Sequence, residues 1–472
     1  MLRDFITAKL KLHLGFEPTK SQLRLIDELA DFLSEEHPGE IMLIKGYAGT
    51  GKTTFVNAIV RSLQELKQRS VLLAPTGRAA KVMSAYTGRQ AWTIHKKIYR
   101  QKAGKDGPGM FVIDRNVYKN TFFIVDESSM IGNKSEESVF GTGDLLRDLF
   151  DYIENGPGCR LILIGDTAQL PPVGLELSPA LDRRNLESMG YRVREMVMTD
   201  VIRQAEGSGV LVNATSIREL IAGAVIAYPR LRLSEYPDIL TIGGDEVIEQ
   251  ISNSYDRYGT EETIVVTRSN KRANRFNAGI RSQILWREEQ ITRGDLLMVV
   301  KNNYFWKDEE NRVDFIANGD IVRITRVKNF EELYGFRFAN VELMLMDYGE
   351  AEIDAKILLD VIDVDGPALP VDRQRELYMS ILADYPELTN RRKKAVHMAG
   401  DPYFNALQVK FAYAVTCHKA QGGQWKSVFI DQGYFTDEML SIDYLRWLYT
   451  AFTRATEKLY LVNFASQFLS EW

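Results

Sequence analysis

The sequence predicts an α/β protein with two parallel sheets, a small β-hairpin insertion and a larger β-barrel-plus-helical insertion. Four short apolar runs early in the chain are separated by segments of helix length: 41–45, 70–75, 122–127 and 161–166. Strands spaced in this way are typical of a parallel sheet covered by helices. The same alternation begins again at 263–267 and resumes after residue 411, whereas β-rich runs between residues 294 and 365 are spaced like a small antiparallel barrel.

We expect three units in this chain of 472 residues, because a domain averages roughly 150 residues. The first unit covers 1–198 and carries a basic, turn-rich insertion at about 85–120, which we interpret as a hairpin. The second unit covers 199–293 and 406–472. The third, 294–405, is inserted into the second and combines the small barrel with a polar helical stretch.

Hydrophobic content, net charge and cysteine count limit the class of protein and the partners that this chain can have. A hydrophobic content of 45% is ordinary for a globular protein, and the net charge of -5 excludes a chain that is basic all over. Any contact with nucleic acid must therefore come from local patches. Cys159 and Cys417 are too few for a disulfide framework, and no run reaches the roughly 18 apolar residues of a membrane span. We expect a cytoplasmic protein with no membrane partner.

The sequence GYAGTGKT at 46–53 predicts a nucleoside-triphosphate site, because it follows an apolar strand and precedes the helical pattern TTFVNAIVRSLQEL. Glycines let the backbone amides curve around phosphates, while Lys52 reaches the β and γ phosphates and Thr53 offers a hydroxyl to Mg²⁺. The alternative is a chance glycine-rich turn. The predicted nucleotide-binding residues of this motif are Gly46, Ala48, Gly49, Thr50, Gly51, Lys52, Thr53 and Thr54.

Two carboxylates, in the sequence VDES, end the apolar run at 122–127, which is the third predicted strand. Asp126 is placed to complete the Mg²⁺ shell with Thr53, and Glu127 to polarise the attacking water. The alternative is a solvated acidic pair at a strand end, which the buried character of the preceding FFIV makes less attractive. Together with the glycine-rich loop, this pair predicts hydrolysis of ATP with Mg²⁺.

The sequence GDTAQLPPVG at 165–174 places Gln169 shortly after a buried strand. A neutral amide accepts a hydrogen bond from water and donates one to phosphate without adding charge, so it suits a sensor. Pro171 and Pro172 restrict the local backbone and hold the glutamine in place. A polar loop stiffened by prolines is the alternative.

These motifs, in this order, resemble those of superfamily 1 helicases, in which two RecA-like domains bind ATP between them. The resemblance implies that Gln169 senses the γ-phosphate beside Asp166. EPTKSQ resembles the adenine-binding Q motif and makes Gln22 the candidate for the base. MTDVIRQ and LYTAFTRATEKLYLV resemble the motifs that supply arginines from the second domain, here Arg203 and Arg454. An arginine fork suits a phosphoryl group whose charge spreads in the transition state.

Three further segments resemble the single-stranded DNA contacts of that superfamily: LAPTGRAA, TIHKKI and VTCHKAQGGQW. They imply a set of DNA-binding residues, namely Thr76, Arg78, His95, Thr416, His418, Lys419 and Gln421. The inserted β-rich unit gives the closest resemblance, to the Dda/RecD-like group of superfamily 1B. That group implies 5′ to 3′ translocation on single-stranded DNA and unwinding of forked duplex DNA, in replication, recombination or repair.

The turn-rich segment 104–110 occupies the place of the strand-separating pin in this resemblance, with Phe111 as its aromatic candidate. Two other functions remain open. A P-loop kinase or transferase shares GYAGTGKT but leaves Arg203 and Arg454 unexplained. An ATP-driven translocase that remodels protein–DNA complexes without processive unwinding shares every ATPase feature with a helicase.

Overall fold

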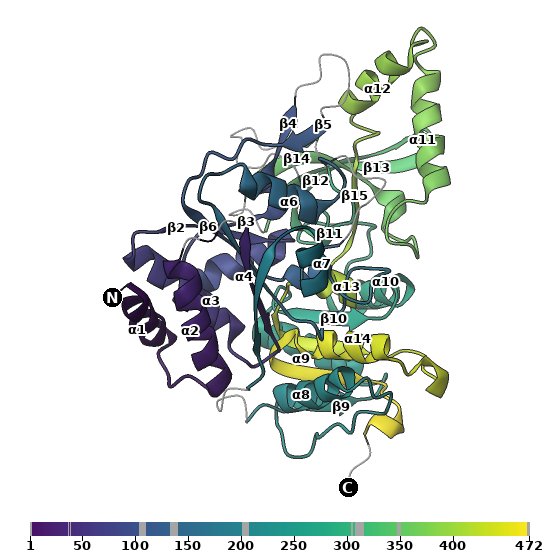
Figure 1. Ribbon diagram of the computed structural model, residues 1–472. Coiled ribbons are helices and arrows are strands. Elements are labelled where there is room, and N and C mark those ends of the chain that lie inside the picture. The colour runs from purple at the N-terminus through teal and green to yellow at the C-terminus, as the bar shows by residue number, and fades with distance from the viewer. Residues whose placement is uncertain are drawn as a thin grey trace.

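A computed structural model describes residues 2–35, 37, 39–102, 110–132, 140–200, 207–303, 305–306, 316–346 and 351–469. Within them the chain forms two parallel sheets covered by helices and a closed barrel (Figure 1). The predicted α/β fold class is confirmed, with two parallel sheets, a closed barrel and a two-stranded hairpin. No helix in the described part of the chain is long and apolar enough to cross a membrane.

The first domain is a parallel sheet with the strand order β3-β2-β6-β7-β1-β8. Its strands are β1 (Glu40–Gly46), β2 (Arg69–Ala74), β3 (Ala91–Thr93), β6 (Thr121–Val125), β7 (Arg160–Gly165) and β8 (Arg192–Met198). Its helices are α1 (Leu2–Leu14), α2 (Lys20–Ser34), α3 (Lys52–Glu65), α4 (Gly77–Thr87), α5 (Ile94–Ile98), η1 (Ser128–Met130), α6 (Leu145–Glu154) and α7 (Arg183–Ser188).

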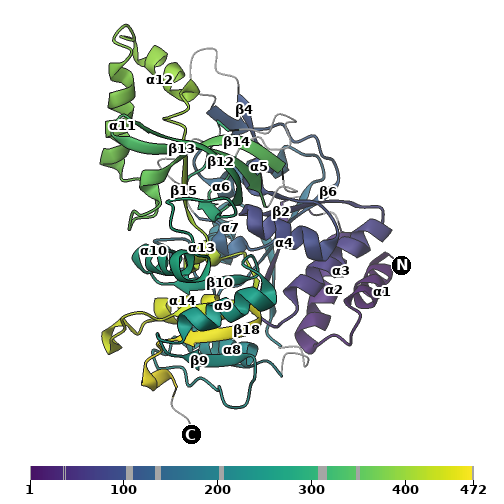
Figure 2. The ribbon, with the colours of Figure 1, turned by 180° about the vertical axis from the view of Figure 1, so that it is seen from behind.

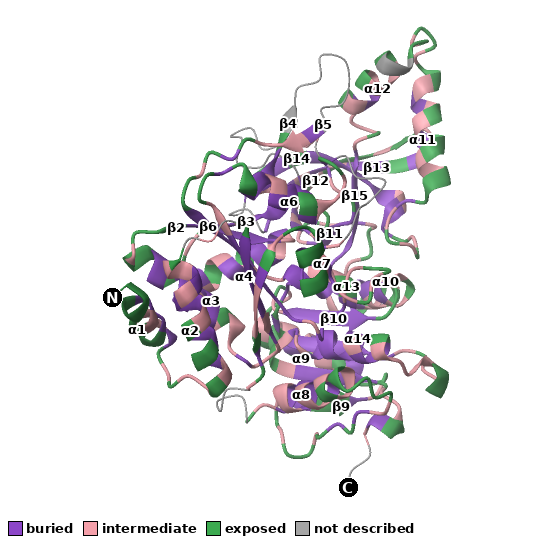
Figure 3. Cartoon of the chain, in the orientation of Figure 1, coloured by how far each residue is buried: buried purple, intermediate pink, exposed green. Residues whose placement is uncertain are grey.

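Alternate residues of each strand point to opposite faces of this sheet, which explains the continuous apolar runs. Met42 and Ile44 pack with helices α1 to α4, whereas Ile41 and Leu43 pack with α5, α6 and α7. Figure 2 shows α2, α3 and α4 side by side on the first of these faces. The strands in Figure 3 are buried between helices whose outer surfaces are exposed. The sheet thus presents its carboxyl-terminal edge, where the predicted motifs lie, to the second domain.

The second domain is a parallel sheet with the order β16-β10-β17-β18-β9. Its strands are β9 (Ile239–Ile242), β10 (Thr263–Thr267), β16 (Ala414–Thr416), β17 (Trp425–Asp431) and β18 (Ala455–Val462). Its helices are α8 (Gly209–Ala222), α9 (Val247–Tyr258), α10 (Asn270–Gly279), η3 (Ile280–Ile284), α13 (Cys417–Ala420), η5 (Asp437–Met439), α14 (Ile442–Phe452) and η6 (Ser466–Phe468).

The barrel closes from β11 (Leu296–Val299), β12 (Ile321–Leu333), β13 (Phe336–Leu345), β14 (Ala351–Leu358) and β15 (Leu407–Phe411). Three more helices follow β14: η4 (Leu359–Val361), α11 (Val371–Ala383) and α12 (Arg391–Gly400). In Figure 1, α11 and α12 project from the barrel at the top of the molecule. The barrel extends past the expected boundary at residue 405, because β15 pairs with both β11 and β14.

The hairpin within 85–120 consists of β4 (Tyr99–Lys102) and β5 (Met110–Ile113). Residues 103–109, which hold most of the segment interpreted as the pin, lie outside the described residues. The start of this insertion belongs to the core instead, since β3 pairs with β2. Phe111 is only 6% exposed, and its ring lies 4.8 Å from that of Phe140. Because its ring packs in the domain core, Phe111 is not placed to act as the aromatic residue of a pin.

Candidate nucleotide cleft and nucleic-acid interface

The glycine-rich loop joins the end of β1 to the start of α3. Gly49 and Gly51 have φ values of 75° and 85°, which disfavour any residue with a side chain. A Cβ on Gly46 would lie 2.8 Å from Lys52 Cγ, so the loop is closely fitted around the lysine. The predicted nucleotide-binding residues Gly46, Ala48, Gly49, Thr50, Gly51, Lys52, Thr53 and Thr54 all lie in this loop and the first turn of α3. The N-terminus of α3, whose first backbone N–H groups have no partner within the helix, fits a phosphate group.

Asp166 lies at the centre of the polar contacts next to this loop and is 1% exposed. Its Oδ2 lies 3.5 Å from Lys52 Nζ and accepts a 2.7 Å hydrogen bond from the hydroxyl of Tyr449. Its Oδ1 accepts a hydrogen bond of 2.9 Å from the backbone N–H of Ala168. A buried carboxylate requires such partners. Asp166 therefore connects the phosphate-binding lysine with α14 of the second domain.

Asp126 and Glu127 follow β6 at the same edge of the sheet. Asp126 accepts hydrogen bonds from the Glu127 N–H at 2.8 Å and from the Tyr86 hydroxyl at 2.7 Å. The exposed hydroxyl of Thr53 and the Asp126 oxygens are hard ligands of the kind that Mg²⁺ prefers, so these residues fit the ion. In the described residues, no three or more His, Cys, Asp or Glu side chains form a metal cluster.

Glu127 has a strained backbone, with φ of 52°, in a region that residues other than glycine seldom adopt. Its pKa is raised, first by burial and then by the neighbouring Asp126, while Arg454 and Lys52 act in the opposite direction. A carboxylate whose pKa moves toward neutral pH is a better general base. Strain and a shifted pKa at one residue favour the predicted role in activating water.

Gln169 is 5% exposed, and its Oε1 has no hydrogen-bond partner among the described residues. The next residue of the same loop, Leu170, is hydrogen-bonded to the second domain. The N–H of Leu170 donates to Thr450 Oγ1 at 2.8 Å, and the carbonyl of Leu170 accepts from Gln421 Nε2 at 2.7 Å. A buried acceptor left without a partner costs free energy, so it suits a group that binds a ligand. This arrangement supports the predicted sensor.

Arg454 is 3% exposed and lies on the second-domain side of the cleft. Its guanidinium donates to the carbonyls of Thr450 at 3.0 Å and Gly423 at 3.1 Å. Its positive charge acts to lower the pKa of Glu127, one of the two predicted catalytic carboxylates. Arg203, the other predicted arginine, lies outside the described residues.

Gln22 is fully buried and holds the glycine-rich loop rather than facing an open base site. Its Nε2 donates to the carbonyl of Thr50 at 3.0 Å, and its Oε1 accepts from the N–H of Thr19 at 2.9 Å. The second bond is half of a capping box at the start of α2. Both ends of the amide are thus engaged within the protein in this structure, and the contact of Gln22 with adenine stays a prediction.

Two second-domain residues near the loop escaped the sequence analysis. Tyr449 accepts a hydrogen bond of 2.8 Å from the Ala48 N–H, and the guanidinium of Arg218 lies 4.6 Å from the ring centroid of Tyr47. Tyr449 belongs to the segment LYTAFTRA that supplied Arg454, but only the arginine had an assigned role. Arg218, in the middle of α8, carries no recognisable signal.

The predicted DNA contacts meet at a second cavity of about 320 Å³ between the two domains and the barrel. It is lined by Pro75, Thr76, Arg78, Thr93, His95, Met130, Asn302, Ala317, Asn318, Gly319, His418, Lys419 and Gln421. All the predicted DNA-binding residues except Thr416 are in this set, and Thr416 shares a smaller neighbouring cavity with Lys419. The structure thus brings these residues together, although they come from three separate sequence segments.

The barrel contributes a wall of this cavity that the sequence analysis missed. Asn302 and the segment 317–319 connect β11 and β12, and the N–H of Asn318 donates to Asn302 Oδ1 at 2.7 Å. The Asn318 side chain in turn accepts a hydrogen bond from Lys419 Nζ. The insertion contains no motif from which this placement can be predicted.

Burial alters the charges in the cavity. It lowers the pKa of His95 to about 4, with Asp148 acting in the opposite direction, so the ring is neutral at pH 7. His95 also packs against Phe140, with ring centroids 4.8 Å apart. Burial lowers the pKa of Lys419 to about 8, so this lysine is mostly charged at pH 7 but loses its charge in mild alkali.

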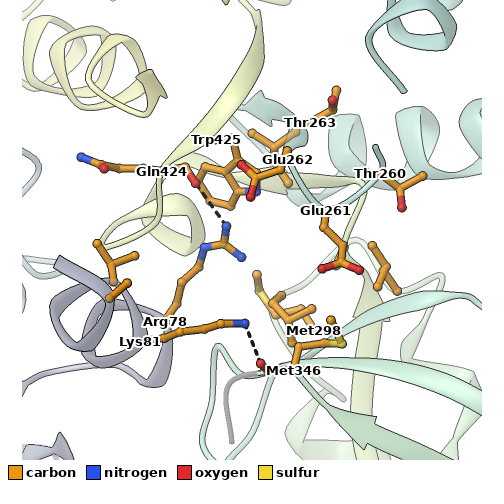
Figure 4. A pocket seen from close by; sticks show the side chains of 16 residues that line it. Arg78, Lys81, Thr260, Glu261, Glu262, Thr263, Met298, Met346, Gln424 and Trp425 are labelled. Atoms are coloured by element: carbon orange, nitrogen blue, oxygen red, sulfur yellow. Dashed lines mark hydrogen bonds between the residues drawn. The ribbon is translucent and has the colours of Figure 1, made fainter. Parts of the chain in front are cut away.

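Arg78 and Gln421 contribute to contacts between domains as well as to the cavity. Figure 4 shows a separate pocket, lined among others by Arg78, Lys81 and Trp425, in which the carbon of the Arg78 guanidinium lies 4.1 Å from the centroid of the Trp425 ring. It donates to the carbonyl of Gln424 at 3.3 Å, while Lys81 from the same helix donates to the carbonyl of Met346 at 2.6 Å. Helix α4 therefore touches both the second domain and the barrel.

Comparisons with known proteins agree with this arrangement. A model described as an AAA domain matches residues 31–175, and a UvrD-like helicase C-terminal domain model matches residues 411–462. The first match contains the glycine-rich loop, the acidic pair and Gln169, and the second contains Gln421 and Arg454.

The ATP-dependent RecD2 DNA helicase of Deinococcus radiodurans is 23% identical over 461 residues, which are 95% of this chain and 50% of that protein. The ATP-dependent DNA helicase Dda of Enterobacteria phage T4 is 32% identical over 133 residues, 28% of each chain. A Bacteroides Pif1 helicase, solved with ADP-AlF3 and single-stranded DNA, gives a TM-score of 0.46 at 13% identity, covering 97% of this chain and 95% of that one. This chain spans about half the length of RecD2. In its two matched domains and over the regions aligned with these relatives, the chain is similar to the RecD2 and Dda helicases.

Proposed function

We propose that this chain is an ATP-dependent DNA helicase that translocates 5′ to 3′ on single-stranded DNA and unwinds forked duplex DNA. One observation carries this proposal: the loop with Asp166 and Gln169 borders the nucleotide cleft, and its next residue is bonded to Gln421 of the DNA cavity. A change in the position of this loop on nucleotide binding would therefore act directly on Gln421 in the cavity. The 5′ to 3′ direction rests on the resemblance of the motifs to those of the superfamily 1B group.

In this proposal the glycine-rich loop and Lys52 bind the phosphates of ATP. Glu127 takes a proton from the attacking water, and Arg454 stabilises the charge that spreads over the transferred phosphoryl group. Mg²⁺, held by Thr53 and Asp126, would neutralise phosphate charge. Gln169 contacts the γ-phosphate, so its loop has different partners before and after hydrolysis.

The DNA cavity grips the strand without reading its sequence. Its lining offers hydroxyls, amides and the cations of Arg78 and Lys419, groups that suit phosphate and sugar more than base edges. Loss of the γ-phosphate removes a contact shared by both domains, so the closed cleft loses its advantage over the open one. Alternate gripping by the two domains then moves the chain along the strand.

The first test of this proposal measures ATP hydrolysis with and without single-stranded DNA. We expect the DNA to stimulate turnover and Lys52→Ala to abolish it, while Lys11→Ala, an exposed change on α1, keeps wild-type turnover. Turnover that is independent of DNA in the wild-type chain would contradict a DNA-driven motor.

The second test compares unwinding of duplexes that carry a 5′ or a 3′ single-stranded tail. We expect unwinding with the 5′ tail only. Preference for the 3′ tail refutes the proposed direction. DNA-stimulated hydrolysis without unwinding of either substrate supports the translocase that remodels protein–DNA complexes instead.

A further inference from the structure

We propose that Tyr449 is a positioning residue whose hydroxyl couples nucleotide binding to closure of the cleft, by holding Asp166 when Lys52 turns from that carboxylate to a phosphate. The inference rests on the proposed function only in assuming that the cleft binds a nucleotide. It assigns a role to a residue of α14 that lies across the cleft from the glycine-rich loop.

A single hydroxyl connects three parts of the molecule. Tyr449 is 1% exposed, so its ring has a fixed position in the core of the second domain. Its oxygen accepts from the Ala48 N–H at 2.8 Å and donates to Asp166 Oδ2 at 2.7 Å. Both partners belong to the first domain, one in the glycine-rich loop and the other in the sensor loop. The hydroxyl therefore bonds simultaneously to two segments that surround the phosphate site.

The partners of Asp166 define what a nucleotide changes. Its carboxylate has the Tyr449 hydroxyl, the Ala168 N–H and, at 3.5 Å, the ammonium of Lys52. A phosphate bound in the loop attracts Lys52, and Asp166 then stays buried with only the first two partners. A buried carboxylate that loses a cation depends more strongly on its remaining donors. Phosphate binding therefore strengthens the bond that ties α14 to the first domain.

The protonation state of Tyr449 agrees with this role. Burial, followed by the nearby Asp166, raises the pKa of the phenol well above its usual value, so the hydroxyl keeps its proton and can donate. The two neighbouring contacts between the domains, from Thr450 and Gln421 to Leu170, hold the same loop. Because coupling between two equilibria is reciprocal, closure by α14 also favours release of Lys52 to the phosphate.

The test is a double-mutant cycle on Tyr449→Phe and Asp166→Asn, read by fluorescence titration with mant-ADP in the absence of DNA. We expect Tyr449→Phe to weaken mant-ADP binding about tenfold, because Asp166 then holds Lys52 more firmly. In the Asp166→Asn background, where no buried charge needs a partner, we expect Tyr449→Phe to change affinity less than about twofold. Equal effects in both backgrounds would overturn the proposal, since they indicate a packing role.

Tyr444→Phe is the matched control, because Tyr444 lies on the same helix but its hydroxyl accepts from Gln432 Nε2, away from the cleft. We expect it to bind mant-ADP like the wild-type chain. Asp166→Asn alone gives an independent check: freeing Lys52 should leave mant-ADP binding at least as tight as in the wild type, and weaker binding would contradict the proposal. These titrations need neither DNA nor turnover, so their outcome is separate from that of the unwinding tests.

Discussion

The nucleotide cleft and the DNA cavity lie on either side of one loop, yet their chemistry differs. The cleft concentrates full charges: Asp126, Glu127 and Asp166 face Lys52 and Arg454 within a largely buried space. The cavity is lined mainly by amides, hydroxyls and a neutral imidazole, with few charges. Between them, Leu170 is bonded to both Thr450 and Gln421.

This difference shows how one chain combines a rigid, highly charged catalytic site with a DNA site whose contacts are of moderate strength. Phosphoryl transfer needs charges fixed where charge develops, and burial makes such charges effective. A strand that must slide needs contacts of moderate strength that tolerate every base. Because the net charge of -5 adds no attraction for DNA, electrostatic binding depends on local cations of the cavity such as Arg78 and Lys419. Variants in the cleft should therefore cause large losses of rate, and variants in the cavity small losses of affinity.

The largest effect is expected for Glu127→Gln. An amide cannot take a proton from water, so kcat of the DNA-stimulated ATPase should fall about 1,000-fold while mant-ADP binding stays within a few fold of the wild type. Glu154→Gln, on α6 and away from the cleft, is the matched control. A loss in kcat smaller than about tenfold would contradict the role of Glu127 as the general base.

A smaller effect is expected for Gln169→Ala. Removal of the sensor amide should lower DNA-stimulated kcat and unwinding about 100-fold, with nucleotide affinity nearly unchanged. Gln64→Ala, at an exposed position on α3, controls for loss of a polar side chain in the same domain. Unwinding at the wild-type rate would reduce the segment GDTAQLPPVG to a stiff loop.

The cleft could be predicted from sequence because its chemistry requires particular residues at fixed spacing. GYAGTGKT, VDES and GDTAQLPPVG each keep their functional groups within a few residues, directly after a strand of one sheet. The alternating strands and helices likewise predicted both sheets, and the spacing of the β-rich runs predicted the barrel, since both patterns are local properties of the chain.

Contacts between distant segments could not be predicted in the same way. Tyr449 is 283 positions from Asp166, and Asn318 is 101 positions from Lys419. No local sequence pattern predicts either contact, because both contacts form only when the domains pack together. Phe111 illustrates the reverse error: its place beside a turn-rich segment made it the aromatic candidate of the pin, yet its ring packs against that of Phe140 in the core.

On the cavity side, pH should change the grip on DNA. Because burial lowers the pKa of Lys419 to about 8, its positive charge is present at pH 7 and lost as the pH rises to 9. We expect single-stranded DNA affinity to fall about fivefold over this range, and Lys419→Arg, which stays charged, to remove most of the change. Fluorescence anisotropy at constant ionic strength measures both. An unchanged pH profile in Lys419→Arg would show that another group titrates.

The smallest effect is expected for Asn318→Ala on the barrel. The Asn318 amide orients the ammonium of Lys419 over the cavity, so its loss should lower single-stranded DNA affinity about twofold and leave DNA-independent hydrolysis unchanged. Asn329→Ala, at an exposed site on β12 away from the cavity, should have no effect. Tighter DNA binding by Asn318→Ala would mean that the barrel competes with the phosphates for Lys419. In that case the barrel would act as a brake on the strand rather than as a wall of the cavity.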